Sequence, residues 1–338
     1  TTLPREPARR DASRRQARQP LDQLAFAEEL LRAQATDGPI LAGCRILAPE
    51  VVAHGTPELK ERLLPELRAG RASACLGYSE PGAGSDLASL KTRAEPRGDD
   101  YLVNGQKLWT TDGDRATHMI LAARTDPDPA VKHGGISLFV VPMETPGISV
   151  RPSMAMYWHT FSTIFFDDVR VPAWCRLGPE NGGWRILANA LASERIVMGA
   201  FASELRDLMC RIVREMMACD LAHDPVARAR MAGLAAEVEV ARALSLRSIV
   251  LGGDRYVPLV ESAMAKVFAS ELSQRLTEAA IDTFGSIATL DEDAPGVPTD
   301  GLIDQLLRRS IMMVVGGGTN EIQRNVIAQR GLGLPSGH

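Results

Sequence analysis

Residues 78–86 read Tyr-Ser-Glu-Pro-Gly-Ala-Gly-Ser-Asp, and residues 318–325 read Gly-Thr-Asn-Glu-Ile-Gln-Arg-Asn. The first segment combines two glycines and a proline with hydroxyl side chains. That composition is typical of a loop that brings backbone N–H groups close to a ligand. The second segment ends a glycine run and opens onto a predicted helix, whose first N–H groups favour an anion. Together the two segments predict a site for a flavin or a phosphate-bearing ligand.

The composition is that of an ordinary globular protein. The 338 residues include 45% apolar and 24% charged side chains, which is enough to bury a sizeable core. A net charge of −4 gives no indication of nucleic-acid binding. No apolar run approaches the length of a membrane span, and we expect no secretory leader. The five cysteines are widely spaced and form no C-x-x-C pair, so we expect reduced thiols, no metal site and a cytoplasmic location.

The N-terminal part of the chain is predicted to be helical after an irregular start. Residues 1–20 are rich in arginine and show no apolar period, which is typical of a solvated terminus. Helical spacing begins at Leu21, and further helices are predicted over residues 40–54 and 58–67. Thr56-Pro57 precedes the last of these as a helix cap followed by proline at the first helical position. We expect residues 21–71 to form an N-terminal helical region.

Residues 72–177 have the pattern of a β domain. Apolar runs at 120–123, 136–141, 148–150 and 163–166 predict strands. Asp99-Asp100 and Asn104-Gly105 are turn signals, and the second predicts a hairpin between residues 101–103 and 107–109. The strand spacing predicts a small barrel or sandwich.

Residues 178–338 return to a helical pattern. Four long helical stretches are predicted at 186–217, 225–251, 259–284 and 302–314, with short connections that are typical of a four-helix bundle. The predicted fold class is therefore α+β, with a helical region, a central β-barrel or sandwich and a C-terminal bundle in that order.

These segments and their order resemble the acyl-CoA dehydrogenase family, flavoenzymes that desaturate acyl thioesters. The resemblance extends roughly over residues 21–335 and is strongest at 76–125 and 305–335. Compared with the family, the N-terminal helical region looks shortened. The resemblance implies FAD as cofactor, an acyl-CoA substrate and an electron-transferring flavoprotein as electron acceptor. It also implies a dimer or tetramer of like or unlike chains, with no nucleic-acid or membrane partner.

The resemblance assigns roles to residues of both segments. Trp109 would cover one face of the flavin, and Thr111 would hydrogen-bond the flavin near N5. Ser79 would contact the flavin, while Ser85 would contact the thioester side of the substrate. Taken alone, Trp109 is more typical of a half-buried strand residue. The full set of implied cofactor contacts is Leu76, Tyr78, Ser79, Gly84, Ser85, Trp109, Thr111, Arg214, Thr319 and Glu321.

Desaturation needs a carboxylate in a dry pocket, where its pKa rises enough for it to take the α-proton. Many family members carry this glutamate directly before the terminal Gly-Thr, and here that position is Gly317. A minority carries it on a bundle helix before an arginine, which Glu194-Arg195 matches. Glu194 is thus the predicted base, Arg195 a substrate contact and the Gly317 N–H a donor to the thioester carbonyl. The alternative is a structural salt bridge, although Glu194 and Arg195 do not face each other on a helix.

Two departures from the family pattern keep other functions open. The family's Arg-x-x-Phe-Gly patch corresponds to residues 214–218, which read Arg-Glu-Met-Met-Ala. Asp282 replaces a glutamine on a later helix, and an acidic group is unfavourable beside a pyrophosphate. The chain could therefore be a non-catalytic or partly catalytic subunit of a heteromeric acyl-CoA dehydrogenase. A flavin oxidase or monooxygenase on the same fold is a further alternative.

Overall fold

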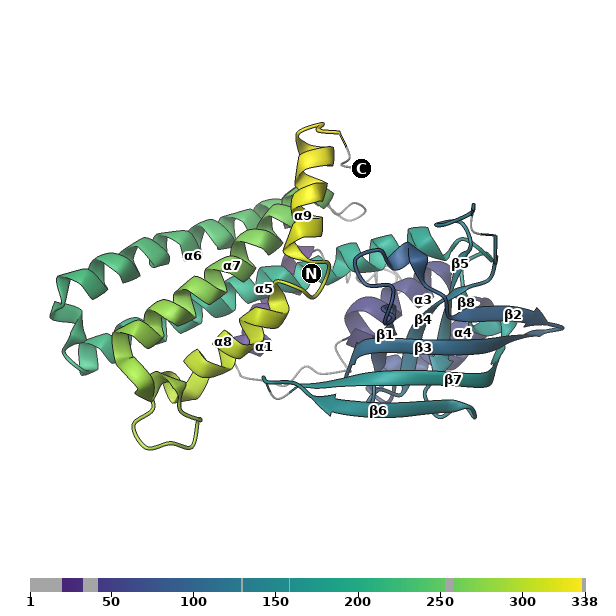
Figure 1. The fold of residues 1–338 in the computed structure, drawn as a ribbon, viewed down its shortest axis with the longest axis horizontal. Coiled ribbons are helices and arrows are strands. Elements are labelled where there is room, and N and C mark those ends of the chain that lie inside the picture. Colours follow the sequence, from purple (N-terminus) through teal and green to yellow (C-terminus); the bar gives the residue numbers. More distant parts are fainter. Residues whose placement is uncertain (1–19, 33–41, 129, 158, 253–257, 336–338) are drawn as a thin grey trace, which may run out of the picture.

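The computed structural model describes residues 20–32, 42–128, 130–157, 159–252 and 258–335. A β domain and a helical bundle lie side by side along the longest axis of the molecule, and α5 (Gly183–Ala218) runs from one into the other (Figure 1). This arrangement confirms the predicted α+β fold class. The predicted domain boundaries after residues 20, 71 and 177 stay predictions.

The strands of the β domain form one mixed, eight-stranded sheet. Its order is β6-β7-β3-β2-β4-β5-β8, and β1 pairs with β4 in parallel. The bounds are β1 Ala74–Gly77, β2 Arg93–Arg97, β3 Asp100–Thr111, β4 His118–Arg124, β5 Ile136–Pro142, β6 Ile148–Met154, β7 Thr160–Pro172 and β8 Arg176–Leu177. All four strands that the apolar runs predicted are present.

Strands β4 and β5 are buried on both faces, which explains their nearly continuous apolar sequences. Leu138 and Ile120 point into a core shared with the N-terminal helices, whereas Phe139 and Leu121 point into a second core. Side chains of β3 and β7, such as Val103, complete that second core. The sheet therefore folds over on itself, in the manner of the predicted barrel or sandwich.

The predicted hairpin turn at Asn104-Gly105 is wrong, because both residues lie inside β3. The turn falls earlier, at residues 98–99 between β2 and β3. Gly105 instead sits at a bulge with φ +144°, where a Cβ atom would lie 2.7 Å from Thr92 Cα. The Asn104 side chain donates to Asp168 Oδ1 at 2.9 Å across the sheet. Close backbone approach, rather than chain reversal, explains this Asn-Gly pair.

The N-terminal helices agree with the predicted pattern where they are described. They are α1 (Pro20–Arg32), a π-helical turn at Gly43–Leu47 that continues into α3 (Ala48–His54), and α4 (Pro57–Arg68). Thr56 Oγ1 caps α4 by accepting from the Leu59 N–H at 3.1 Å, as predicted. Most of the predicted irregular terminus, residues 1–19, and the predicted helix start at residue 40 lie outside the described residues.

The bundle consists of α5, α6 (Pro225–Gly252), α7 (Leu259–Phe284) and α8 (Leu302–Met313), followed by the short α9 (Asn320–Val326). Leu205, Val238, Leu276 and Leu306, one from each long helix, meet in a single core. The predicted ends of these helices are correct to within three residues. Among the described helices, none combines the length and apolarity that a membrane span requires.

Candidate active site

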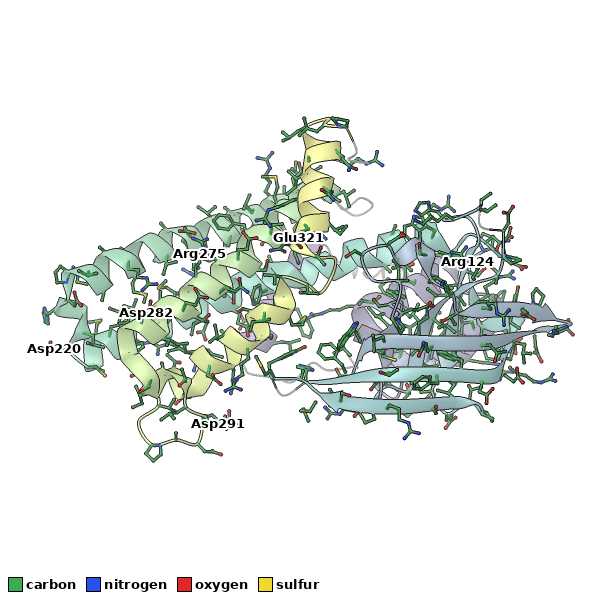
Figure 2. All side chains as sticks on the ribbon, in the orientation of Figure 1. Arg124, Asp220, Arg275, Asp282, Asp291 and Glu321 are labelled. Carbon is green, nitrogen blue, oxygen red and sulfur yellow. The ribbon has the colours of Figure 1, made fainter. Side chains whose placement is uncertain are left out.

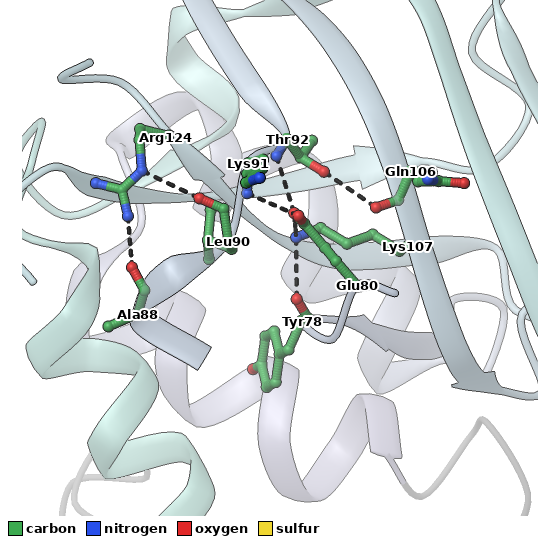
Figure 3. Close-up of polar contacts among 9 residues, drawn as sticks. All are labelled: Tyr78, Glu80, Ala88, Leu90, Lys91, Thr92, Gln106, Lys107 and Arg124. Carbon is green, nitrogen blue, oxygen red and sulfur yellow. Dashed lines mark hydrogen bonds and ion pairs between the residues drawn. The ribbon is translucent and has the colours of Figure 1, made fainter. Parts of the chain in front are cut away.

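A buried ion pair holds the loop of residues 78–86 in place (Figure 3). The fully buried Lys107 Nζ donates to Glu80 Oε1 at 2.8 Å and to the Tyr78 carbonyl at 3.0 Å. The Glu80 carboxylate also accepts from the backbone N–H groups of Lys91 at 2.7 Å and Thr92 at 2.9 Å. One lysine and one glutamate thus fix the start of the loop to β3 and to the segment before β2.

The two buried charges shift each other's pKa values in the direction that keeps both groups ionised. Burial alone would raise the pKa of Glu80, but the Lys107 charge and the hydrogen bonds from Lys107, Thr92 and Lys91 hold that pKa below its usual value. Burial lowers the pKa of Lys107 to about 8, and Glu80 opposes the shift. Glu80 therefore stays ionised near neutral pH, since a buried ammonium needs a counter-charge.

Arg124 supports the segment that directly follows this loop. Its guanidinium donates to the Leu90 carbonyl at 3.1 Å and to the Ala88 carbonyl at 2.6 Å (Figure 3). Asp86 forms an ion pair with Lys132 at 2.8 Å. Asp86 also accepts from Ser89 Oγ, so its carboxylate acts as a local anchor.

Trp109 stands next to this loop in an unusual conformation. The Leu108 N–H donates to the Ser79 carbonyl at 2.9 Å and so joins the loop to β3. Trp109 has a φ of +60° and is 65% exposed, and its ring meets the Phe161 ring edge-on with the centroids 6.2 Å apart. A left-handed backbone is costly for a bulky residue and is typical of functional sites. The indole is therefore not the half-buried packing residue that its strand context alone would favour.

The other predicted contacts of this region differ in their accessibility. Gly84, Ser85 and Thr111 are exposed, Leu76 and Ser79 are half-buried, and Tyr78 is buried in the core below the loop. A Cβ atom added at Gly84 would meet no atom within 4 Å, so the backbone there is open to a ligand. The exposed indole, the open glycine backbone and the Thr111 hydroxyl fit a flat aromatic cofactor such as a flavin.

The second predicted segment starts at the end of a tight connection between α8 and α9, residues 314–319, which we call the glycine arch. Gly317 and Gly318 have φ values of +65° and +87°, which only glycine adopts without strain. Thr319 Oγ1 caps α9 by accepting from the Ile322 N–H at 3.2 Å. The exposed Glu321 has a pKa lowered by its own backbone N–H and by Thr319. Thr319 and Glu321 thus use N–H groups that were expected to hold an anion.

A second buried lysine anchors the glycine arch to α7. Lys266 Nζ donates to the carbonyls of Val314 at 3.2 Å and Gly318 at 3.0 Å, and to Asn320 Oδ1 at 2.7 Å. Burial lowers the pKa of Lys266 to about 8. The exposed Gly317 N–H takes part in no hydrogen bond among the residues that the structure describes.

Glu194 and Arg195 lie within α5, as the predicted helix requires. The side chains of residues 191–200 lie outside the described side chains, so the direction of the predicted base stays a prediction.

Arg214, in the altered patch, and Asp282, which replaces a glutamine, both bond to groups of the bundle. Arg214 is exposed and donates to the Cys210 carbonyl of its own helix at 3.3 Å. Asp282, near the end of α7 (Figure 2), forms an ion pair with Arg230 at 2.7 Å. The carboxylate that the sequence marked as unfavourable for a pyrophosphate is therefore paired with a cation of the same chain.

A cavity of about 530 Å³ lies between the β domain and the bundle. Tyr157 and His159 line it from the β6–β7 connection, opposite an ion pair between Glu204 and Arg309. The Tyr157 ring contacts Phe161 at 6.0 Å, and Phe161 in turn contacts Trp109. Burial raises the pKa of Tyr157 to about 12. The remaining lining residues are Asp291, Glu292, Asp293, Leu302, Gln305 and Leu306.

Sequence reasoning missed Glu80, Lys107 and Lys266. The available signals were weak: Lys107 was considered only as part of the strand next to Trp109, and Lys266 interrupts an alanine-rich stretch of α7. No group of three or more His, Cys, Asp or Glu side chains in the described part of the chain could hold a metal. All five cysteines are free thiols.

Comparison with known proteins identifies the family. Residues 75–169 match the model of the acyl-CoA dehydrogenase middle domain, and residues 181–332 match the model of the acyl-CoA dehydrogenase C-terminal domain. The chain belongs to the acyl-CoA dehydrogenase family and is an oxidoreductase. This family is FAD-dependent and acts in lipid metabolism.

Individual relatives and solved structures are similar to most of the chain. The chain is 36% identical to acyl-CoA dehydrogenase FadE26 of Mycobacterium tuberculosis, over 95% of this chain and 82% of that protein. It is 33% identical to cyclohex-1-ene-1-carbonyl-CoA dehydrogenase of Syntrophus aciditrophicus, over 85% and 69%. The solved Tcur3481-Tcur3483 steroid ACAD superposes with a TM-score of 0.90 at 30% identity, over 95% and 83%. The ChsE4-ChsE5 complex of Mycobacterium tuberculosis gives 0.87 at 34% identity, over 95% and 84%.

Proposed function

We propose that this chain removes two hydrogens from the α and β carbons of an acyl-CoA thioester, with Glu194 taking the α-proton. The observation that carries the proposal is the exposed Trp109 at a φ of +60°, joined to the pinned loop of residues 78–86. A bound FAD would accept the hydride from the β-carbon. Trp109 would cover one face of the ring system and exclude water, and Thr111 would fix its orientation.

The proton side of the reaction depends on residues of the bundle. Glu194 on α5 would take the proton, while Arg195 and Ser85 would hold the substrate. The Gly317 N–H, which forms no hydrogen bond among the described residues, would donate to the thioester carbonyl as negative charge develops there. Of the remaining cofactor contacts, Thr319, Glu321 and Arg214 come from the bundle side, whereas Leu76, Tyr78, Ser79 and Gly84 belong to the β domain.

A bulky, ring-bearing acyl group is the proposed substrate class. Two relatives are named for such substrates, a cyclohexene carbonyl-CoA and a steroid. Glu204, Asp291, Glu292 and Asp293 line the cavity of about 530 Å³ between the β6–β7 connection and the bundle, so the relatives, and not this cavity, support the ring-bearing class.

An unlike subunit and an electron-transferring flavoprotein are the proposed partners. Two of the similar structures carry the names of two chains in their titles, which supports a heteromeric assembly. The free cysteines support a cytoplasmic location. Gly317 stands where many members carry their base, so a partly catalytic subunit is the second candidate if Glu194 has no role.

An anaerobic titration tests the proposal. The purified protein, with its partner chain where one co-purifies, is mixed with ring-bearing and straight-chain acyl-CoAs while the flavin absorbance is followed. We expect bleaching by a ring-bearing thioester in the wild type, and at least ~100-fold slower bleaching with flavin still bound in Glu194→Gln. Asp207→Asn, which changes another carboxylate of α5, is the control and should bleach normally. Normal bleaching by Glu194→Gln would exclude Glu194 as the base.

A further inference from the structure

The glycine arch is attached to α7 at both of its ends through one side chain. A lysine ammonium has three N–H donors, and Lys266 directs them at Val314 O, Gly318 O and Asn320 Oδ1. The two carbonyls lie four residues apart, so the clamp encloses Val315, Gly316 and Gly317. The enclosed backbone has no other side-chain anchor among the described residues except Gln323, whose Nε2 donates to the Gly317 carbonyl at 3.1 Å.

Asn320 ties the clamp to a rigid element. Its backbone N–H donates to Val314 O at 2.9 Å, and its amide donates to Ser270 Oγ at 3.1 Å and Glu271 Oε1 at 3.0 Å. Glu271 in turn forms an ion pair with Arg324 of α9 at 2.6 Å. Since Ser270 and Glu271 belong to α7, the arch cannot shift without breaking several buried hydrogen bonds.

The clamp is costly, which argues that it does more than fill the core. Lys266 is 2% exposed, and within the described part of the chain its ammonium donates to neutral oxygens, while Glu271 and Glu321 act on it from a greater distance. Burying an ammonium without a contacting carboxylate costs desolvation free energy, which the hydrogen bonds to the three oxygens must offset. The compensating gain is a fixed backbone for residues 315–317, which lie between the two bonded carbonyls.

We propose that Lys266 is a positioning residue for the dehydrogenation, because its clamp holds the glycine arch so that the Gly317 N–H points at the thioester carbonyl. The inference rests on the proposed function. Without the clamp, the described contacts of the enclosed segment are the Gln323 bond and two backbone N–H bonds to the Met312 carbonyl, and positive φ is as accessible to its glycines as negative φ. A donor must be in place before the reaction in order to lower its barrier.

The test compares Lys266→Met with Arg275→Met. Both variants remove a cation from α7, but Arg275 is exposed and pairs with Glu237 at the surface (Figure 2). In Lys266→Met we expect kcat to fall about tenfold or more with KM changed by less than about threefold, because a donor to the transition state is displaced. Amide hydrogen exchange of residues 314–320 should accelerate in the same variant. Arg275→Met should change neither quantity.

Three results would overturn the proposal: wild-type kcat in a folded Lys266→Met, a rise in KM alone, or unchanged exchange at residues 314–320.

If Lys266→Met does not fold, the exchange of the wild-type arch is followed from pH 7 to 9.5, with α6 as reference. The charged groups around Lys266 are Glu271, Glu321 and Arg324, and the pKa of Lys266 is lowered to about 8. Its deprotonation removes a donor, so the arch should loosen across this range, and an unchanged ratio to α6 would reject the clamp. The exchange measurements do not require turnover, so they test the clamp even if the wild type dehydrogenates no acyl-CoA. The proposed function and the clamp can therefore be rejected independently.

Discussion

The loop of residues 78–86 and the glycine arch are each held by a buried lysine, but by different chemistry. Lys107 pairs with the Glu80 carboxylate, whereas Lys266 bonds two carbonyls and an amide oxygen. Their glycines differ as well. Gly84 lacks a positive φ and has open space where a Cβ would be, while the arch glycines Gly317 and Gly318 both have positive φ. The fold itself requires the arch glycines, whereas the glycine of the first loop leaves room for a ligand.

The largest expected effect is a difference in the free energy of unfolding lost when each of the two lysines is replaced by methionine. Lys107→Met leaves the Glu80 carboxylate buried without its counter-charge, so the free energy of unfolding should fall by about 3–5 kcal/mol. Lys266→Met leaves only neutral acceptors unpaired and should cost about 1–3 kcal/mol. Urea denaturation of both variants measures the difference. A loss for Lys266→Met equal to or larger than that for Lys107→Met would contradict the assignment of one charged and one neutral clamp.

A somewhat smaller effect is expected in acid. The pKa of Glu80 is lowered below its usual 4.5 in the folded protein, so its contribution to stability is complete above pH 4.5 and is lost as the pH falls through the folded value. Hydrogen exchange should therefore show the loop of residues 78–86 loosening in acid before the arch does. Glu80→Gln should remove this pH dependence. Simultaneous loosening of both segments would show that Glu80 does not control the loop.

The smallest effects come from the glycines. Gly318→Ala places a Cβ 2.7 Å from Gln323 Nε2 at a φ of +87°, and this should cost about 1–2 kcal/mol of unfolding free energy. Gly84→Ala should stay within about 0.5 kcal/mol of the wild type, since nothing lies within 4 Å of the added atom. Its effect should instead be weaker flavin binding, measured by titration. Unchanged flavin affinity in Gly84→Ala would argue that the open backbone does not face the cofactor.

Much of the fold could be predicted from sequence because its elements are long and periodic. The limits of α7 follow from its apolar period and the punctuation on either side, and the Thr56-Pro57 cap specifies the start of α4. The turn predicted at Asn104-Gly105 was wrong because the conformation there is decided by a close contact with Thr92 on the neighbouring segment, which the local sequence does not show. Lys107 and Lys266 could not be assigned for a related reason. A lysine becomes a buried clamp only through carbonyls that tertiary packing brings to it.

The most direct test of the account is whether FAD stacks on Trp109. Tryptophan emission is followed while FAD is added to the flavin-free protein, with its partner chain where one co-purifies, and the titration is repeated with Trp109→Phe. The account predicts saturable quenching in the wild type and a clearly smaller amplitude in Trp109→Phe, because the exposed indole would lie against the flavin ring. Equal quenching amplitudes in the two proteins would contradict it.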